Sequence, residues 1–320
     1  MQENKDLSLS VIVPCFNEEE SLPHFLQVVI PVLEEMGRPY ELLLIDDGSK
    51  DNTSNIIVME TQRNAHVRGI VLSRNFGKEA ALTAGLDEAT GDAVIMMDAD
   101  LQHPPELLPE LVAKWEEGYD MVVPCNHNRA GQSWLLRLLS RSFYKIITQI
   151  SSVKLPPSAS DFRLMDRTVV NAIKALPERS RFMKGIYAWA GFKTYLMEYQ
   201  TKPRLYGSPK WNFWSRWNFA LDGIFAYSSL PLRIWMYIGV FVALFSLAWA
   251  FWIAISAVLY GVNVVVGITT TTILVLFMNG LLMISIGIIG EYVGRIFEEV
   301  KQRPIYIVKN RVGKGLGTKE

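Results

Sequence analysis

The chain has 320 residues, 32 of them basic and 32 acidic, so its formal net charge is zero. This length is sufficient for one catalytic domain and a further segment, and the neutral balance provides no overall positive field for binding nucleic acid. The polar first ten residues contain no apolar stretch typical of a signal peptide, so we expect the N-terminal part to stay in the cytoplasm.

Apolar stretches rich in β-branched residues alternate with stretches of helical periodicity over the first 125 residues. The patterns predict strands at 8–13, 40–45, 67–72, 92–97 and 120–124, and helices at 19–36, 51–63, 78–89 and 105–115. We expect Pro14 to end the first strand, and a further helix to form at 166–175. Strands and helices that alternate in this way form right-handed βαβ units. The sequence therefore predicts an α/β fold, with a mostly parallel sheet covered by helices on both faces.

Polar residues follow three of the predicted strands, as Asn17-Glu18, Asp46-Asp47 and Asp98-Ala99-Asp100. Because ligands in such sheets bind beyond the carboxyl ends of the strands, we expect one site built from several loops. Asp98 and Asp100 are hard oxygen ligands suited to Mg²⁺ or Mn²⁺ bridged to a diphosphate. The alternative for this pair is a solvated acidic turn.

Two segments have the composition of helices that lie on a membrane. In 133–147, Arg137, Arg141 and Lys145 recur at every fourth position between apolar residues, which predicts an amphipathic helix. The alternative is an ordinary surface helix packed on the core. The segment 211–232 begins with three tryptophans in seven residues, which favours a juxtamembrane interfacial helix or, alternatively, an aromatic core patch.

No charged residue occurs between positions 234 and 290. This stretch is too long for one membrane-spanning helix and predicts two, at 233–259 and 270–292. Basic residues flank the pair and are absent from the loop between them, so the positive-inside rule places both ends, with a tail of residues 293–320, in the cytoplasm. Gly280, Gly287 and Gly290 permit close helix packing, which is compatible with a homo-oligomer, but glycine is common in membrane helices and the sequence leaves the oligomeric state open. The polar end at 310–320 is expected to be disordered.

Six short motifs occur together in the chain: VIVPCFNE at 11–18, DDGS at 46–49, SRNFGKE at 73–79, DADLQ at 98–102, DFRLM at 161–165 and GEYVGR at 290–295. In combination they resemble the family 2 glycosyltransferases with a GT-A fold. They look most like the polyprenyl-phosphate glycosyltransferases of the bactoprenol glucosyltransferase type, which are related to dolichol-phosphate mannose synthase. The resemblance covers nearly the whole chain and implies a GT-A (Rossmann-like) catalytic domain at 1–210, followed by a two-helix transmembrane hairpin.

The resemblance also implies roles for individual residues. Residues expected to bind the donor nucleotide are Pro14, Phe16, Glu18, Asp47, Asp98, Gln102, Arg204 and Lys210. Residues expected to bind the acceptor phosphate or lipid are Arg129, Arg137, Arg141 and Lys145. Asp98 and Asp100 would hold a divalent Mg²⁺ or Mn²⁺ ion, and the expected catalytic residues are Asp100 and Asp161. Because a phosphate acceptor is largely dianionic at neutral pH and scarcely needs a base, we expect Asp161 chiefly to position it.

The implied reaction is the transfer, with inversion, of a sugar from a nucleotide-sugar to undecaprenyl phosphate or another polyprenyl phosphate. The product would be a polyprenyl-monophosphate sugar in a membrane, the plasma (inner) membrane if the source is bacterial. Glucose from UDP-glucose is the expected donor sugar, and GDP-mannose or an aminosugar nucleotide is the alternative. An alternative of another class is a membrane scaffold that binds a nucleotide-sugar without catalysis, but intact Asp98, Asp100, Asp161 and Lys210 argue against it.

Overall fold

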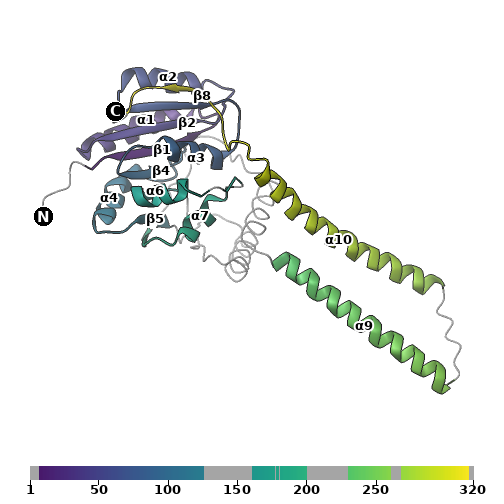
Figure 1. Cartoon of the computed structure of the whole chain (residues 1–320). Coiled ribbons are helices and arrows are strands. Elements are labelled where there is room, and N and C mark those ends of the chain that lie inside the picture. The colour runs from purple at the N-terminus through teal and green to yellow at the C-terminus, as the bar shows by residue number, and fades with distance from the viewer. Residues whose placement is uncertain are drawn as a thin grey trace.

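The computed structural model describes residues 7–125, 161–199 except 177 and 180, 230–260 and 268–316. Within these residues a sheet of eight strands runs in the order β7-β5-β6-β4-β1-β2-β3-β8 (Figure 1). The strands are β1 (Leu9–Cys15), β2 (Tyr40–Asp46), β3 (Val67–Leu72), β4 (Ala93–Met96), β5 (Met121–Cys125), β6 (Arg163–Asp166), β7 (Thr194–Glu198) and β8 (Val308–Val312). The centre, β4-β1-β2-β3, is parallel, whereas β6 and β8 pair antiparallel with their neighbours.

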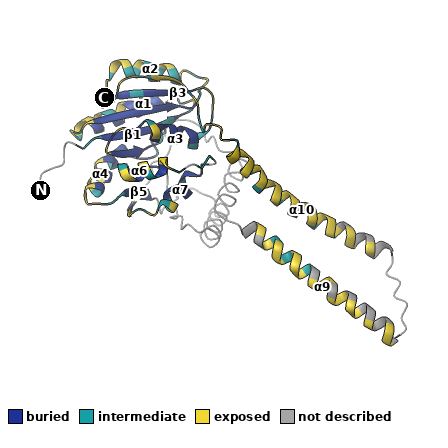
Figure 2. Cartoon of the chain, in the orientation of Figure 1, coloured by how far each residue is buried: buried dark blue, intermediate teal, exposed yellow. Residues whose placement is uncertain are grey.

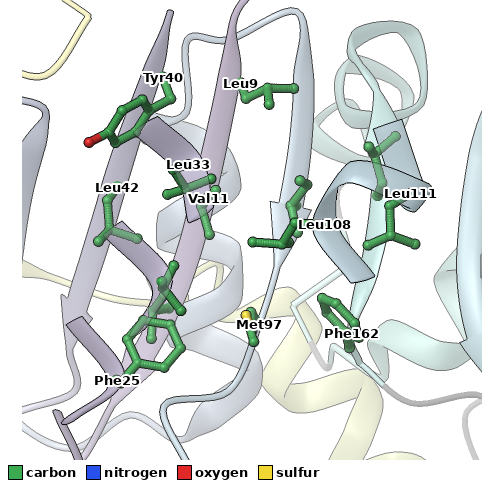
Figure 3. Packing of buried hydrophobic residues seen from close by; sticks show 14 of the residues in the cluster. Leu9, Val11, Phe25, Leu33, Tyr40, Leu42, Met97, Leu108, Leu111 and Phe162 are labelled. Carbon is green, nitrogen blue, oxygen red and sulfur yellow. The ribbon is translucent and has the colours of Figure 1, made fainter. Parts of the chain in front are cut away.

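Helices cover both faces of the sheet, as the alternating pattern predicts. The helical elements are α1 (Ser21–Glu35), α2 (Thr53–Arg63), α3 (Lys78–Glu88), η1 (Pro105–Leu107), α4 (Leu108–Glu116), α6 (Arg167–Lys174), α7 (Met183–Ala190), α9 (Leu230–Tyr260) and α10 (Ile268–Val300). Helices α1, α2 and α4 contribute to one buried apolar cluster, in which Phe25 and Leu108 lie near Met97 (Figure 3). Helices α3, α6 and α7 pack in a second cluster on the opposite face. The two layers hold the strand ends, and the loops that follow them, in fixed positions.

Every strand and helix predicted between residues 8 and 125 is present, but Pro14 does not end the first strand. Strand β1 continues through Pro14 to Cys15, and Pro14 lies opposite Ile45 of β2. Pairing with β4 on the other side stops at Ile12. Proline is tolerated here because beyond Ile12 the strand has a neighbour on one side alone, so its missing N–H breaks no ladder hydrogen bond.

The expectation of disorder from residue 310 is wrong for part of that segment. Strand β8 pairs antiparallel with β3, and Ser73 N–H donates to the Ile307 carbonyl at 2.9 Å. Val308 and Val312 at its two ends are partly buried, whereas the three polar residues between them are exposed, so the local pattern gives no sign of a strand. Strands β6 and β7 were also not predicted, although the DFRLM motif falls on β6.

Both helices expected after residue 230 are present as α9 and α10; α9 is a few residues longer than predicted, and α10 continues to Val300, well beyond the predicted end at 292. Their described side chains are largely exposed, in contrast to the buried sheet (Figure 2). Among the described residues, the segment Phe277–Val300 is long and apolar enough to cross a membrane, and α9 contains a shorter apolar stretch at Ile234–Ser246. The two-helix unit projects from the sheet domain, and α10 leads directly into β8 (Figure 1).

Candidate active site

The loop after β1 is tied to the loop after β2. Asn17 N–H donates to Ser49 Oγ at 3.0 Å, and Lys50 N–H donates back to the Asn17 side chain at 2.8 Å. Glu18 N–H donates to Thr53 Oγ1 at 2.8 Å. Asn17 has a φ of 50°, in the left-handed region that asparagine tolerates better than most residues. These bonds keep Pro14, Phe16 and Glu18 at the same end of the sheet as Asp47, where the parallel strands have their carboxyl ends.

The carboxylate of Asp47 fixes the loop between β3 and α3. It accepts hydrogen bonds from the N–H groups of Phe76 at 2.7 Å and Gly77 at 2.9 Å. Burial raises the pKa of Asp47, although these two hydrogen bonds act in the opposite direction. Gly77 has a φ of 98°, which a residue with a side chain adopts only with strain. The carboxylate thus holds the backbone that starts α3, and the predicted contact of Asp47 with the nucleoside stays a prediction.

Lys78, the first residue of α3, joins two carboxylates from different loops. Its Nζ lies 2.7 Å from Asp98 Oδ1 and 2.9 Å from Asp161 Oδ2. The side chains of Lys78, Asp98 and Asp161 are 35%, 31% and 17% exposed, respectively, so the cluster reaches the surface of the site. Burial would lower the pKa of Lys78, but Asp98 and Asp161 together raise it and keep the ammonium charged. The loops after β2, β3 and β4, together with the entry to β6, therefore converge.

Asp161 has a second cation on its other side. Lys184 Nζ lies 3.9 Å from Asp161 Oδ1. Burial alone would raise the pKa of Asp161, but the ammonium groups of Lys78 and Lys184 hold it well below its usual value. Asp161 is therefore a carboxylate at any physiological pH.

The DADLQ turn, at residues 98–102, is held close to Phe162, the residue that follows Asp161. Gln102 N–H donates to Asp100 Oδ1 at 3.1 Å. His103, the next residue, stacks on Phe162 with ring centroids 4.9 Å apart, and its Nδ1 lies 2.6 Å from the Tyr199 hydroxyl. Burial lowers the pKa of His103, so the ring is neutral near pH 7. A rigid aromatic contact thus sets the spacing between the acidic turn and Asp161.

The acidic turn has the donor set of a magnesium or manganese site that is completed by substrate. Within the described residues, no group of three or more His, Cys, Asp and Glu side chains is placed to hold a metal ion. Asp98 and Asp100 supply two carboxylates, and Mg²⁺ is typically held by one or two carboxylates together with substrate phosphates and water. The two aspartates therefore fit a divalent ion that arrives with a diphosphate.

The structure brings eight predicted residues to one end of the sheet: Pro14, Phe16, Glu18, Asp47, Asp98, Asp100, Gln102 and Asp161. Six others lie outside the described residues: Arg129, Arg137, Arg141, Lys145, Arg204 and Lys210. Their roles stay predictions.

Sequence reasoning missed three charged residues of the site, Lys78, Glu79 and Lys184. Lys78 and Glu79 end the SRNFGKE motif, so their place in it was the available signal. Glu79 Oε2 accepts a hydrogen bond from Met183 N–H at 3.3 Å, which ties α3 to the start of α7. Burial, together with the charge of Asp161, raises the pKa of Glu79 to about 7. Lys184 follows no motif and is recognised from its position beside Asp161.

Two family models match the chain. Residues 10–174 match the model described as glycosyl transferase family 2, and residues 230–296 match the model described as the GtrB C-terminal hairpin. With the GT-A arrangement of sheet and helices, these matches define a glycosyltransferase. The chain belongs to glycosyl transferase family 2. The hairpin and the apolar segment of α10 associate it with a membrane.

Curated relatives are similar along almost the entire chain. An uncharacterised glycosyltransferase of Synechocystis sp. is 47% identical and the alignment covers 96% of both chains. The bactoprenol glucosyl transferase of Shigella phage SfX is 45% identical, over 95% of this chain and 100% of that one. A prophage bactoprenol glucosyl transferase homolog of Escherichia coli is 44% identical, over 95% and 99%. These alignments include both the catalytic domain and the hairpin.

Proposed function

We propose that the protein transfers a sugar from a nucleotide-sugar, with inversion, to the phosphate of a polyprenyl lipid such as undecaprenyl phosphate. The observation that carries this proposal is the 45% identity to a bactoprenol glucosyl transferase over the catalytic domain and the hairpin together. Glucose from UDP-glucose is the donor sugar that this similarity favours. GDP-mannose or an aminosugar nucleotide is the alternative, because the described contacts include none that selects a sugar hydroxyl.

The donor would lie across the loops that follow β1, β2 and β4. Pro14, Phe16, Glu18 and Asp47 would surround the nucleoside, and Gln102 would lie near the diphosphate. Asp98 and Asp100 would hold a Mg²⁺ or Mn²⁺ ion, which supplies positive charge to the leaving diphosphate. Arg204 and Lys210 would add fixed positive charge there, which stabilises the leaving group more as its negative charge develops.

Asp161 would position the acceptor rather than remove a proton from it. Lys78 and Lys184 keep the pKa of Asp161 well below its usual value, which makes it a weak base. A phosphate monoester is already largely dianionic near pH 7 and is a nucleophile without further deprotonation. The role that suits a charged and immobilised carboxylate is to orient the groups around it.

The hairpin match, and the basic residues that flank the hairpin, support a proposal for the membrane arrangement. We infer that α9 and α10 both span the membrane, with the catalytic domain and both termini in the cytoplasm. Arg129, Arg137, Arg141 and Lys145 would then face anionic headgroups and the lipid phosphate. This arrangement would bring a water-soluble donor and a membrane-bound acceptor to the same site.

A transfer assay tests the proposal. Purified protein in detergent, with Mg²⁺ or Mn²⁺ and undecaprenyl phosphate, is incubated with a panel of radiolabelled UDP- and GDP-sugars. We expect label from UDP-glucose to enter the organic phase, and Asp98→Ala to abolish this transfer. Transfer from a different nucleotide-sugar would show that the predicted donor is wrong but that the reaction class is right. If the wild-type enzyme binds the nucleotide-sugar but transfers no label to polyprenyl phosphate, the proposal that a polyprenyl phosphate is the acceptor is refuted.

A further inference from the structure

Four charged side chains form a row of alternating sign that leads away from the acidic turn. Asp98 contacts Lys78 at 2.7 Å, Lys78 contacts Asp161 at 2.9 Å, and Lys184 lies 3.9 Å from the far oxygen of Asp161. The donor diphosphate would bind at the Asp98 end. Lys184 is thus a cation on the side of Asp161 that is remote from the donor.

Lys184 differs from Lys78 in the hydrogen bonds that it has available. Lys78 directs its Nζ at both carboxylates, at hydrogen-bonding distances. Lys184 is too far from Asp161 for a hydrogen bond, and within the described part of the chain it donates none. Asp161 Oδ1 is buried and also lacks a hydrogen-bond partner there. The Lys184 side chain is 27% exposed, so its ammonium group has N–H donors that a ligand arriving from solvent or from a membrane can use.

Helix α7, which carries Lys184, is fixed on the side of the domain that meets the hairpin. Tyr187 of α7 packs under Arg163 of β6, whose guanidinium lies 3.7 Å from the ring centroid. In the segment leading into α7, Arg179 N–H donates to the Glu299 carboxylate near the end of α10 at 3.1 Å. Trp189 of α7 is 59% exposed, and tryptophan is a residue enriched at the headgroup level of membranes. A ligand that reaches Lys184 from this side would come from the membrane.

We propose that Lys184 binds the phosphate group of the lipid acceptor. The inference rests on the proposed function and adds a residue to it. An acceptor dianion that approached Asp161, Asp98 and Asp100 alone would be repelled. Lys78 offsets part of the carboxylate charge, and Lys184 supplies the unshared donors that a phosphate needs. The same chemistry would suit the donor diphosphate, but Lys184 lies beyond Asp161 in the row, on a helix whose preceding segment contacts α10, and this favours the acceptor.

Initial-rate kinetics of Lys184→Met, Lys184→Arg and wild type test the proposal. The acceptors are undecaprenyl phosphate and citronellyl phosphate, a short-chain prenyl phosphate, each varied at saturating donor. We expect Lys184→Met to raise the KM of both acceptors about 10- to 100-fold, because a charge-assisted hydrogen bond to phosphate is lost whatever the length of the chain. The donor KM should be unchanged, and Lys184→Arg should restore much of the acceptor affinity. Lys174→Met is the matched control, since Lys174 bonds to the Asp87 carbonyl instead.

Three results would overturn the assignment to the acceptor. These are an unchanged acceptor KM, a rise for undecaprenyl phosphate without one for citronellyl phosphate, and a rise in the donor KM instead. If Lys184→Met does not fold, amine-reactive labelling of the wild-type protein decides, with Lys184 modification read by mass spectrometry. Citronellyl phosphate should protect Lys184, whereas UDP with Mg²⁺ should not, and a lack of protection by citronellyl phosphate contradicts the proposal. A wild-type enzyme that transfers no sugar to either prenyl phosphate refutes the proposed function, and labelling still reports on phosphate binding.

Discussion

Lys78 donates to Asp98 in the turn after β4 and pairs with Asp161 just before β6. These two carboxylates are 63 positions apart in the chain, yet one ammonium group spans them. The arrangement keeps Asp161 ionised and holds the two carboxylates at a fixed separation before any substrate binds. Catalysis by positioned charge depends on this kind of preorganisation, because no further reorganisation is needed when the bond breaks.

The charge state of Asp161 gives a prediction for the pH dependence of the reaction. Its pKa lies well below the usual value, so its ionisation is complete at neutral pH and produces no limb in the rate profile there. We expect Asp161→Asn to lower kcat by on the order of 10²-fold, by a similar factor at every pH tested. Measurement of kcat against pH for both enzymes checks this. A limb that is present in the wild type and absent from the variant would show that Asp161 is a base.

Glu79 makes the stability of the domain depend on pH near neutrality. Its pKa is raised from 4.5 to about 7, so the folded state holds this proton more tightly than the unfolded chain does. The stabilisation is fully present below about pH 4.5 and is lost as the pH rises through about 7. Glu79→Gln keeps an acceptor for Met183 N–H and cannot ionise. Its Tm should therefore exceed that of wild type near pH 8 and approach it near pH 5, and an identical Tm difference at both pH values would contradict the shift.

Among the elements, strand β8 has the clearest structural role. It covers the edge of β3, and Arg311 pairs with Glu88 at 2.7 Å. We expect deletion of residues 306–320 to lower the free energy of unfolding by about 2–4 kcal/mol, since several backbone hydrogen bonds of about 1 kcal/mol each are lost. Chemical unfolding in detergent measures this. Arg311→Ala is the control: it removes an exposed ion pair while the ladder remains, and it should cost less than about 1 kcal/mol. Equal losses in the two proteins would show that the strand itself contributes little.

The elements divide clearly into those that local patterns predict and those that they do not. Strands such as β2, with the sequence YELLLID, are apolar throughout because they are buried on both faces. Strands β6, β7 and β8 have four or five residues and mixed polarity, and they form because a neighbouring edge is available. That information is tertiary and is absent from a local window.

The residues of the site also divide into those that the sequence predicts and those that it does not. Asp47, Asp98 and Asp100 follow predictable strands, so their convergence at one end of a parallel sheet could be expected. The pairing of Lys78 with Asp161, and the position of Lys184 beside it, depend on how α3 and α7 pack on the sheet. No spacing in the chain encodes these contacts. Motif similarity placed Lys78 near the site but gave it no role.

At the scale of the whole molecule, the catalytic domain and the hairpin are joined by contacts as well as by the chain. Arg179 N–H bonds to Glu299 at 3.1 Å, and the Tyr306 hydroxyl donates to Asp87 at 2.8 Å. Both contacts lie where α10 ends and β8 begins (Figure 1). The first contact ties the catalytic domain to the end of α10, and the second ties it to the segment between α10 and β8.

The basic stripe predicted at 133–147 gives a test of how the domain meets the membrane. We expect the double variant Arg137→Glu with Arg141→Glu to raise the KM of undecaprenyl phosphate in anionic liposomes, because each basic residue near such a surface contributes about 1 kcal/mol. Binding of the nucleotide-sugar, measured by calorimetry, should be unchanged. The increase should shrink in neutral liposomes, unlike that of Lys184→Met. An unchanged acceptor KM would show that these basic residues do not help to bind the acceptor lipid.

The return of the chain to β3 after α10 also fixes an order of events during synthesis. The ribosome makes β3 first, then the hairpin, and β8 after the hairpin. Until β8 emerges, β3 lacks this antiparallel neighbour, and by then both hairpin helices have left the ribosome. The sheet is thus completed after the hairpin has been made, so the catalytic domain finishes folding only once the segment that associates it with a membrane already exists.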